Sequence, residues 1–563
     1  MVAGQNYGVR ALRGWIKLVL APDAGYLKIA AVYGVAISLL SLATPISVQL
    51  LINSVANTAL PAPLFTLALI LFLLLALSGI LSAIRIHLMA RFERRWFARI
   101  VAEITLRAVH AQNPFFTDAL RGDLFNRYFD LMTVQKALPS LIIGGFTIAL
   151  QGVIGLAVTS FYHPFFLAFN AVLVLLLLLV WQFWASAAIS SAVEKSQAKH
   201  SAAHWLESVG GSNGFYKSSR HLAYAIQRSE TLTAGYVAAH RKHFSYTFAQ
   251  TIALLLIYAL ASATLLALGG WLIIRGELSI GQLVAAELIL SGVFYGISQF
   301  GTYLEALYEF AAGLEELSLF WEIPQEQGQT GGTGPVDGAV RLRGAEYGDH
   351  RFDFSIESGE QLVVMAAAGV EGSLSRLLKR HAVARRGMVL IGGGDISGFD
   401  MYRLRADIMV FDRPSFVEMS IRDYLRLAAS GTQDGMIGVL ETVDLAGRIS
   451  SLEKGLDTII SSSGWPLSVG ELIALKLAAA LLARPKLLVL SPLYDLMPPD
   501  CLNRALTRLR ESGTTVLQFT RRPQGIVRDG YLWIGTTSQT RCATDTELME
   551  TAKREGSANA LQA

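Results

Sequence analysis

Residues Leu467–Pro499, LSVGELIALKLAAALLARPKLLVLSPLYDLMPP, hold the pattern that decides the fold of the C-terminal part of the chain. A loop containing Ser and Gly opens this stretch and is followed by a helix rich in Ala and Leu, which we expect to end at the turn Arg484-Pro485. Leu487–Leu490 is then an unbroken apolar run, typical of a strand in the middle of a parallel sheet. The stretch therefore predicts a loop, a helix and a buried strand in direct succession.

Short apolar runs alternate with helical stretches over the whole part of the chain that follows residue 338. The pattern predicts a helix at Ser375–Arg385. Besides the strand at Leu487–Leu490, it predicts strands at Leu362–Ala366, Met388–Ile391, Ile408–Phe411 and Thr515–Phe519. This alternation is typical of an α/β domain with a mostly parallel sheet covered by helices.

The overall composition is that of a membrane protein. Of the 563 residues 52% are hydrophobic, and the mean hydropathy is +0.43, too apolar for an ordinary soluble protein. The formal net charge of +4 is small for this length, and the basic residues lie mostly between apolar runs, so we expect no nucleic-acid partner. The two cysteines, Cys501 and Cys542, exclude a disulfide framework or a Cys-based metal site.

Six segments are long enough to cross a bilayer, which takes about 20 residues each. The short connections Asn53–Pro61 and Phe161–Pro164 carry no Lys or Arg, whereas the long connections are rich in both. The positive-inside rule therefore predicts an integral multi-pass protein of the plasma or bacterial inner membrane, with both termini in the cytoplasm. The expected spans are Ala30–Val55, Pro63–Ile84, Leu141–Phe161, Pro164–Trp184, Thr251–Ile274 and Ser279–Leu304.

The connections Arg85–Pro139 and Ala185–Gln250 read as continuous helix, so the membrane helices are expected to extend far into the cytoplasm. Glu322–Gly338 is rich in Gly, Pro, Gln and Thr, which is typical of a flexible linker. The predicted organisation is an amphipathic cytoplasmic segment at 1–26 without a signal peptide, a six-helix transmembrane domain at 27–321, a linker at 322–338, an α/β domain at 339–556 and a tail at 557–563.

These features together resemble a type I ABC exporter half. Leu467–Glu471 takes the place of the family's LSGGQ signature. The sequence of Asn113–Arg127 resembles the family's first coupling helix. Ser279–Leu283 is also familiar from peptide and protein exporters. The resemblance implies a membrane α-helical bundle of six transmembrane helices with long cytoplasmic extensions, joined to a C-terminal α/β ABC nucleotide-binding domain of the P-loop type.

This domain departs from the family pattern at the phosphate loop. In a P-loop, backbone N–H groups surround the phosphates, a Lys neutralises the β/γ charge and a hydroxyl holds magnesium. Aligned on Gly369, the Lys position holds Gly372, the Gly before it is Glu371, and only the hydroxyl of Ser373 remains. A carboxylate at this position repels a triphosphate. We therefore expect the degenerate P-loop Gly369, Gly372 and Ser373 to bind ATP weakly or not at all.

The other family positions are replaced as well. Asp412 stands where the resemblance implies the Gln that contacts magnesium, and Arg521 stands at the switch His. The magnesium-binding Asp and the catalytic Glu after the buried strand are replaced by Ser491 and Pro492. We therefore predict no catalytic residue, no cofactor in the chain's own pocket and no intrinsic ATPase activity.

Ser468 and Gly470 lie at the signature-like position. In the family, these residues contact the nucleotide held by the opposite subunit, so they could complete the Mg-ATP site of a partner. The alternative is that Ser468 simply caps the helix that begins near Glu471. The sequence favours capping slightly.

The resemblance implies that two halves assemble into one transporter. The main hypothesis is a silent half-transporter that pairs, as a heterodimer, with an ATPase-competent half and exports a peptide or amphipathic substrate. Membrane lipid is its other expected partner. One alternative is a non-transporting membrane scaffold or regulator whose ABC-like domain is a docking surface. A self-sufficient ATP-driven exporter is the third reading, which the replaced motifs disfavour.

Two histidine pairs have the helical spacing of metal ligands, His200 with His204 and His240 with His243. Neither pair has a carboxylate or Cys fixed beside it in the sequence, and both are expected on a solvated cytoplasmic helix. We therefore predict no metal site.

Overall fold

The computed structural model describes residues 9–58, 62–112, 123–326, 332–413, 416–428 and 435–560. Its contacts divide the chain into two compact units, Met1–Gln325 and Glu326–Ala563. The division falls inside the stretch 322–338 that the sequence suggests as a linker. Each unit is described by itself below.

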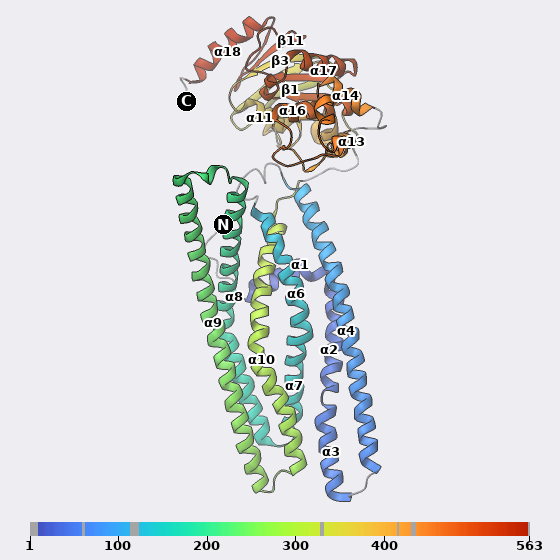
Figure 1. Ribbon diagram of the computed structural model, residues 1–563, viewed down its shortest axis with the longest axis vertical. Coiled ribbons are helices and arrows are strands. Elements are labelled where there is room, and N and C mark those ends of the chain that lie inside the picture. The colour runs from blue at the N-terminus through green and yellow to red at the C-terminus, as the bar shows by residue number, and fades with distance from the viewer. Residues whose placement is uncertain are drawn as a thin grey trace. The chain divides into compact units, whose positions relative to one another are not determined.

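The first unit is a bundle of long helices, and α1 runs across it (Figure 1). One π-helical turn, Leu141–Gly145, joins α6 and α7. The helices are α1 (Val9–Leu20), α2 (Ala24–Leu40), α3 (Ala43–Thr58), α4 (Ala62–Val109), α6 (Asp130–Ser140), α7 (Phe146–Ser160), α8 (Pro164–Gly211), α9 (Ser219–Ile274) and α10 (Ile280–Ser318). Short 3-10 turns lie at Ala21–Asp23, Asp123–Phe129, Phe215–Lys217 and Leu319–Glu322.

Six helical stretches of the described residues are long and apolar enough to cross a membrane, which confirms the predicted number of spans. With 48 and 56 residues, α8 and α9 would measure about 72 and 84 Å. A hydrocarbon core is only about 30 Å thick, so both helices continue well beyond it, as expected. The stretches are Val9–Ile52, Leu64–Val109, Leu124–Ser160, Pro164–Gly211, Ser219–Ile274 and Ile280–Glu322.

The first span differs from the expected single helix, because it is broken between α2 and α3 at Ser41 and Leu42. Pro45 follows the break. Proline has no backbone N–H, so the carbonyl of Ser41 loses its intrahelical partner four residues on. The sequence-based prediction of a continuous Ala30–Val55 span overlooked this proline.

The helix α10 is the centre of the bundle, because it packs against α3, α6, α7, α8 and α9. Glycines bring α7 and α10 close together. A methyl group at Gly296 of α10 would lie 2.6 Å from Ile148 Cγ2 of α7, and one at Gly155 of α7 would lie 2.9 Å from Val293 Cγ2 of α10. Small residues at such crossings allow van der Waals contact between membrane helices.

The second unit is built on a six-stranded sheet with the order β12-β11-β3-β10-β9-β6. All neighbours in it are parallel except β11 and β12. A four-stranded antiparallel sheet, β2-β1-β4-β5, and a small pair, β7-β8, complete the set. The strands are β1 (Val340–Tyr347), β2 (His350–Ile356), β3 (Gln361–Ala366), β4 (Arg386–Ile391), β5 (Gly394–Asp395), β6 (Ile408–Phe411), β7 (Met419–Ser420), β8 (Ile459–Ile460), β9 (Leu487–Leu490), β10 (Thr515–Phe519), β11 (Gly530–Ile534) and β12 (Gln539–Cys542).

The central strands are buried on both faces. Along β9, Leu488 and Leu490 belong to one apolar cluster, and Leu487 and Val489 belong to another. The first cluster includes α13, α14, α16 and α17, and the second includes α11 and the antiparallel sheet. The helices are α11 (Val370–Leu378), α12 (Met401–Asp407), α13 (Ile421–Ala428), α14 (Met436–Thr442), α15 (Ala446–Ser450), α16 (Val469–Ala483), α17 (Pro499–Glu511) and α18 (Asp545–Ala560), with 3-10 turns at Ile396–Gly398, Gly455–Asp457 and Pro492–Leu496.

The structure confirms the α/β class and corrects two details. The predicted strand Met388–Ile391 exists as β4, but it pairs with β1 in the antiparallel sheet and does not join the parallel one. The helix predicted at Ser375–Arg385 is α11, which begins at Val370 and ends at Leu378. It starts earlier because Gly369 has a φ of +81°, a left-handed conformation that turns the chain from strand to helix.

Candidate functional site

The expected phosphate loop lies between β3 and α11. Gly369 is the left-handed residue before the helix, and the Ser373 N–H donates to the Gly369 carbonyl at 3.2 Å. Gly372 is exposed, whereas Ser373 is buried. The backbone of a strand, a glycine turn and a helix N-terminus is therefore present, but the one hydroxyl is turned into the protein.

Glu371 decides the electrostatics of this loop. Burial and, to a lesser extent, Asp412 raise the pKa of the Glu371 carboxyl to about 7, although Arg521 acts to lower it. The structure thus brings together three positions that lie far apart in the sequence, at the ends of different elements. A carboxyl group occupies the first turn of α11, where a phosphate-binding loop needs positive potential.

The strand ends opposite this loop carry no acid at the expected places. Ser491 follows β9 and is buried, and its hydroxyl accepts from the Leu493 N–H at 3.4 Å. Pro492 opens the 3-10 turn after it. The Arg521 backbone N–H donates to Asp495 Oδ2 at 3.1 Å. These groups cap local turns, and neither Ser491 nor Pro492 supplies an anionic oxygen for magnesium.

The residues of this pocket therefore do not fit a magnesium nucleotide. Glu371 interacts there with Asp412 and with the guanidinium of Arg521, whereas the amines of Lys379 and Lys476 interact with Asp412. A triphosphate would add several negative charges beside these two carboxyl groups.

Ser468 is the N-cap of α16, and it forms a capping box with Glu471. The Glu471 N–H donates to Ser468 Oγ at 3.3 Å, and the Ser468 N–H donates to Glu471 Oε2 at 2.7 Å. Arg448 holds the same carboxylate through an ion pair of 3.0 Å. The structure therefore confirms that Ser468 caps α16. The helix begins at Val469, two residues before the expected start near Glu471.

The signature-like loop is nevertheless open to a partner. Ser468 is exposed, and a side chain at Gly470 would meet nothing within 4 Å. The neighbouring Trp465 is 75% exposed and Val469 is 46% exposed. The start of α16 is therefore accessible from outside this unit.

A network of mostly buried charges joins four elements of the first unit, and sequence reasoning missed it. Asp130 of α6 accepts from Lys199 Nζ at 2.6 Å and lies 2.5 Å from His200 Nε2, both on α8. Arg127, in the 3-10 turn before α6, forms a buried ion pair with Glu316 of α10. The expected solvated position of His200 is wrong, since only 3% of it is exposed.

Ligand-type atoms of Asp130, His200 and Glu316 lie within 4.8 Å of one another. A metal ion would have to displace Lys199 from Asp130 and Arg127 from Glu316, because each carboxylate already has a cationic partner. The arrangement therefore suits an ion-pair network that fixes the helices relative to one another. His243, also expected to be solvated, is likewise buried, 3.0 Å from Ser191 Oγ.

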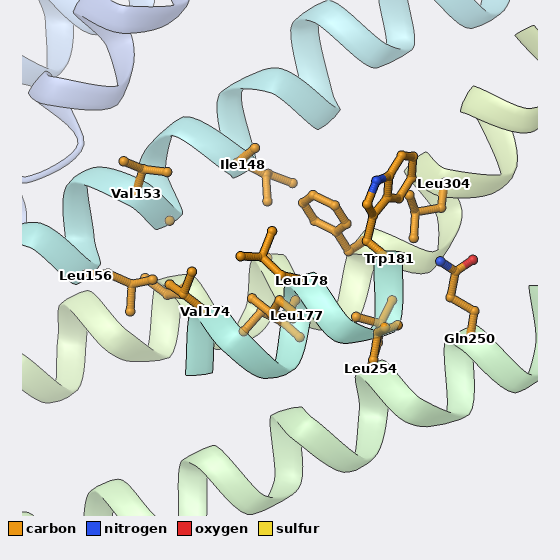
Figure 2. A pocket seen from close by; sticks show the side chains of 17 residues that line it. Ile148, Val153, Leu156, Val174, Leu177, Leu178, Trp181, Gln250, Leu254 and Leu304 are labelled. Carbon is orange, nitrogen blue, oxygen red and sulfur yellow. The ribbon is translucent and has the colours of Figure 1, made fainter. Parts of the chain in front are cut away.

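The first unit also has a partly open pocket of about 340 Å³ between α7, α8, α9 and α10 (Figure 2). Its wall is apolar except for Gln250 of α9 and the indole nitrogen of Trp181 of α8. The expectation for residues 113–122, the main part of the resemblance to a coupling helix, lies outside the described residues.

One known family matches the membrane part of the chain. Residues 28–297 match the ABC transporter transmembrane region family. Over 97% of its length the chain has the fold of a bacterial Atm1-family ABC exporter whose structure was solved with ATP bound, with a TM-score of 0.79, 16% identity and 99% of that chain covered. This likeness covers both units and shows that each has the fold of its counterpart in an ABC exporter half.

Two groups of curated relatives extend the match. The alpha-hemolysin translocation ATP-binding protein HlyB of Proteus vulgaris is 24% identical over 488 residues, which are 81% of this chain and 66% of that protein. The leukotoxin translocation ATP-binding protein LktB of Mannheimia glucosida is 23% identical over 476 residues, 80% of this chain and 66% of that protein. The chain thus spans about two thirds of the length of these relatives.

Proposed function

Because this chain carries an ABC transporter transmembrane region within the fold of an ABC exporter half, we propose that it is the catalytically silent half of a heterodimeric exporter. The observation that carries the proposal is the Glu371 carboxyl in the first turn of α11, beside Asp412, at the place of the phosphates. No lysine side chain stands at Gly372 to offset it. ATP hydrolysis would then come from a competent partner half.

The surface around Ser468 supports pairing. The exposed serine, the open glycine at 470 and the large exposed ring of Trp465 lie together at the start of α16. We propose that this surface completes the Mg-ATP site of the partner, with Ser468 and the first N–H groups of α16 directed at the partner's nucleotide. The capping box would hold the loop in this position.

The proposed cargo is a peptide or another amphipathic molecule. The names of the relatives describe translocation of alpha-hemolysin and leukotoxin, which supports a polypeptide. The apolar pocket supports a cargo with an apolar part. The proposed location is the plasma or bacterial inner membrane, with the charge-rich connections in the cytoplasm.

The test is purification of the chain from its native membrane, followed by identification of what co-elutes. A stoichiometric ABC half with intact motifs supports the proposal. A stable homodimer without such a partner would instead support a membrane scaffold whose second unit is a docking surface. An azido-nucleotide that labels the isolated chain, with release of phosphate, would establish a self-sufficient exporter and overturn the silent assignment.

In the paired complex, Ser468→Ala tests the contribution to the partner's site. We expect ATPase activity to fall while the Ser463→Ala variant, which alters another exposed serine of the preceding loop, keeps it. Unchanged activity in Ser468→Ala would leave only the capping role.

A further inference from the structure

Glu315 of α10 is a buried carboxyl group whose hydrogen bonding is incomplete. Only 4% of the residue is exposed, and its Oε2 has no hydrogen-bond partner among the described residues. Glu315 directly precedes Glu316, which belongs to the charge network that joins α6, α8 and α10. A buried carboxylate that lacks a partner is costly, so this position calls for a cation or a proton.

The two neighbouring carboxyl groups already have cationic partners. Asp130 of α6 accepts from Lys199 at 2.6 Å and lies 2.5 Å from the His200 ring, so a positive charge on that imidazole would first serve Asp130. Glu316 forms its ion pair with Arg127. The basic side chains of the network are therefore committed before Glu315 is considered.

The groups that act directly on Glu315 leave it as the carboxyl in excess. Glu316 and Glu322 add negative charge beside it, whereas Arg127 and the Gln197 amide of α8 act in the opposite sense. Arg127 is already paired with Glu316, so an ionised Glu315 would have to share that one guanidinium. A proton on Glu315 removes the excess negative charge.

The helices are packed too closely at this level for water to hydrate an ionised Glu315. A methyl group at Gly313, two residues earlier in α10, would lie 2.7 Å from Val134 Cγ2 and 3.4 Å from the Asp130 carbonyl oxygen, both of α6. Such packing leaves no room for a water molecule, whereas a proton needs no volume. Hydration of the carboxylate would therefore require α10 to move away from α6 or α8.

Glu315 lies well beyond the hydrocarbon core, on the side predicted to be cytoplasmic. It is 35 residues from the start of α10 at Ile280, about 52 Å along the helix. The core is only about 30 Å thick. The network also reaches solvent at Lys199, whose side chain is 48% exposed. A proton at this site would therefore exchange with water and not with lipid.

We propose that Glu315 is a proton-binding site of the first unit: its carboxyl holds a proton at neutral pH, and release of this proton to water loosens the packing of α10 against α6 and α8. Buried glutamic acids titrate at values as high as about 8–9. The packed state binds a proton that a hydrated carboxyl has already released at neutral pH, so its stability is highest in acid and falls as the pH rises. Proton binding here requires neither a partner half nor a nucleotide.

Infrared difference spectroscopy of the full chain in phospholipid nanodiscs detects the proton directly, because an un-ionised carboxylic acid has a carbonyl band that a carboxylate lacks. We expect the difference between the unmodified chain and Glu315→Gln to contain this band at pH 7. The band should disappear in a one-proton titration as the pH rises to about 9–10. The matched control is Glu305→Gln, which alters an exposed glutamate of the same helix and should leave the band in place.

Hydrogen exchange of the α6 and α10 amides in the same nanodiscs measures the packing. Between pH 5.5 and pH 7.5, local opening should become more favourable by about tenfold or more after correction for the intrinsic exchange rate, because the release of one proton contributes up to about tenfold per pH unit. In Glu315→Gln the opening should change by less than about twofold over this range. Glu305→Gln should behave like the unmodified chain.

Three results would overturn the proposal: absence of the Glu315 carbonyl band at pH 7, the same pH dependence of exchange in the unmodified chain and in Glu315→Gln, or one equivalent of a metal ion in the purified chain that Glu315→Gln loses. The last result would make a metal cation, and not a proton, the partner of the buried carboxyl. Because the chain is tested alone, failure here is distinct from failure to find a competent partner half.

Discussion

Glu371 gives the second unit a pH-dependent stability. The pKa of its carboxyl is raised from 4.5 to about 7, mainly by burial and then by Asp412. Since the folded state disfavours the ionised form, the free energy of unfolding is highest below pH 4.5 and falls as the pH rises toward 7. Above about pH 7 the loss is complete.

The magnitude follows from the size of the shift. Raising the pKa of a carboxyl from 4.5 to about 7 corresponds to at most about 3.4 kcal/mol. Glu371 is only partly buried, so solvent screening reduces this value, and we expect about 1–2 kcal/mol. Glu371→Gln removes the ionisation and should stabilise α11 by this amount at pH 8.5, with a much smaller gain at pH 5.

Hydrogen exchange of the α11 amides in the full-length protein measures this local stability. Glu453→Gln, at an exposed turn of the same unit, is the control and should change nothing. Asp412→Asn should move the pH at which protection falls to a lower value, and Arg521→Met should move it to a higher one. Equal stabilisation by Glu371→Gln at pH 5 and pH 8.5 would refute the assignment of a raised pKa.

Three further predictions concern a buried ion pair, a helix cap and a close contact of a glycine. Glu316→Gln leaves Arg127 buried without its counter-charge and should cost about 3–5 kcal/mol, seen as a lower thermal midpoint, whereas replacing both residues by methionine should cost less. Ser468→Ala should cost about 1 kcal/mol in the first turn of α16, measured by hydrogen exchange, and no change would contradict the capping box. Gly338→Ala would place a methyl group against the Lys486 carbonyl, so a loss of about 1–3 kcal/mol is expected, and an unaltered unfolding midpoint would refute it.

The sequence predicted well those features that depend on apolar runs. The six spans and the strands β3, β6, β9 and β10 follow from length and hydrophobicity alone. The sheet to which Met388–Ile391 belongs could not be predicted, because a short apolar run does not show which strand it pairs with. The early start of α11 depended on the left-handed Gly369, a backbone property that helix periodicity does not contain.

The candidate site likewise has some features that the sequence shows and others that only tertiary packing creates. The positions of Ser491 and Arg521 could be predicted from the sequence, since each follows a recognisable strand. The pairing of Asp130 with His200 could not, because 70 residues separate them and only tertiary packing brings them together. Gln250 stood at the predicted end of a cytoplasmic connection, and nothing in the sequence indicated that one side of its amide would be left without a partner.

The positions of the proposed replacements are compatible with an intact fold. The cores of β9 and β10 are buried on both faces, so a polar substitution there would cost several kcal/mol. The altered positions lie instead in the turns after strands and at the start of α11, where a new side chain changes charge and leaves packing intact. At Gly372, for example, a side chain would meet nothing within 4 Å. A lysine would therefore fit at Gly372, but the neighbouring carboxyl of Glu371 would partly neutralise its positive charge. We therefore expect Gly372→Lys alone not to confer nucleotide binding unless Glu371 is replaced as well.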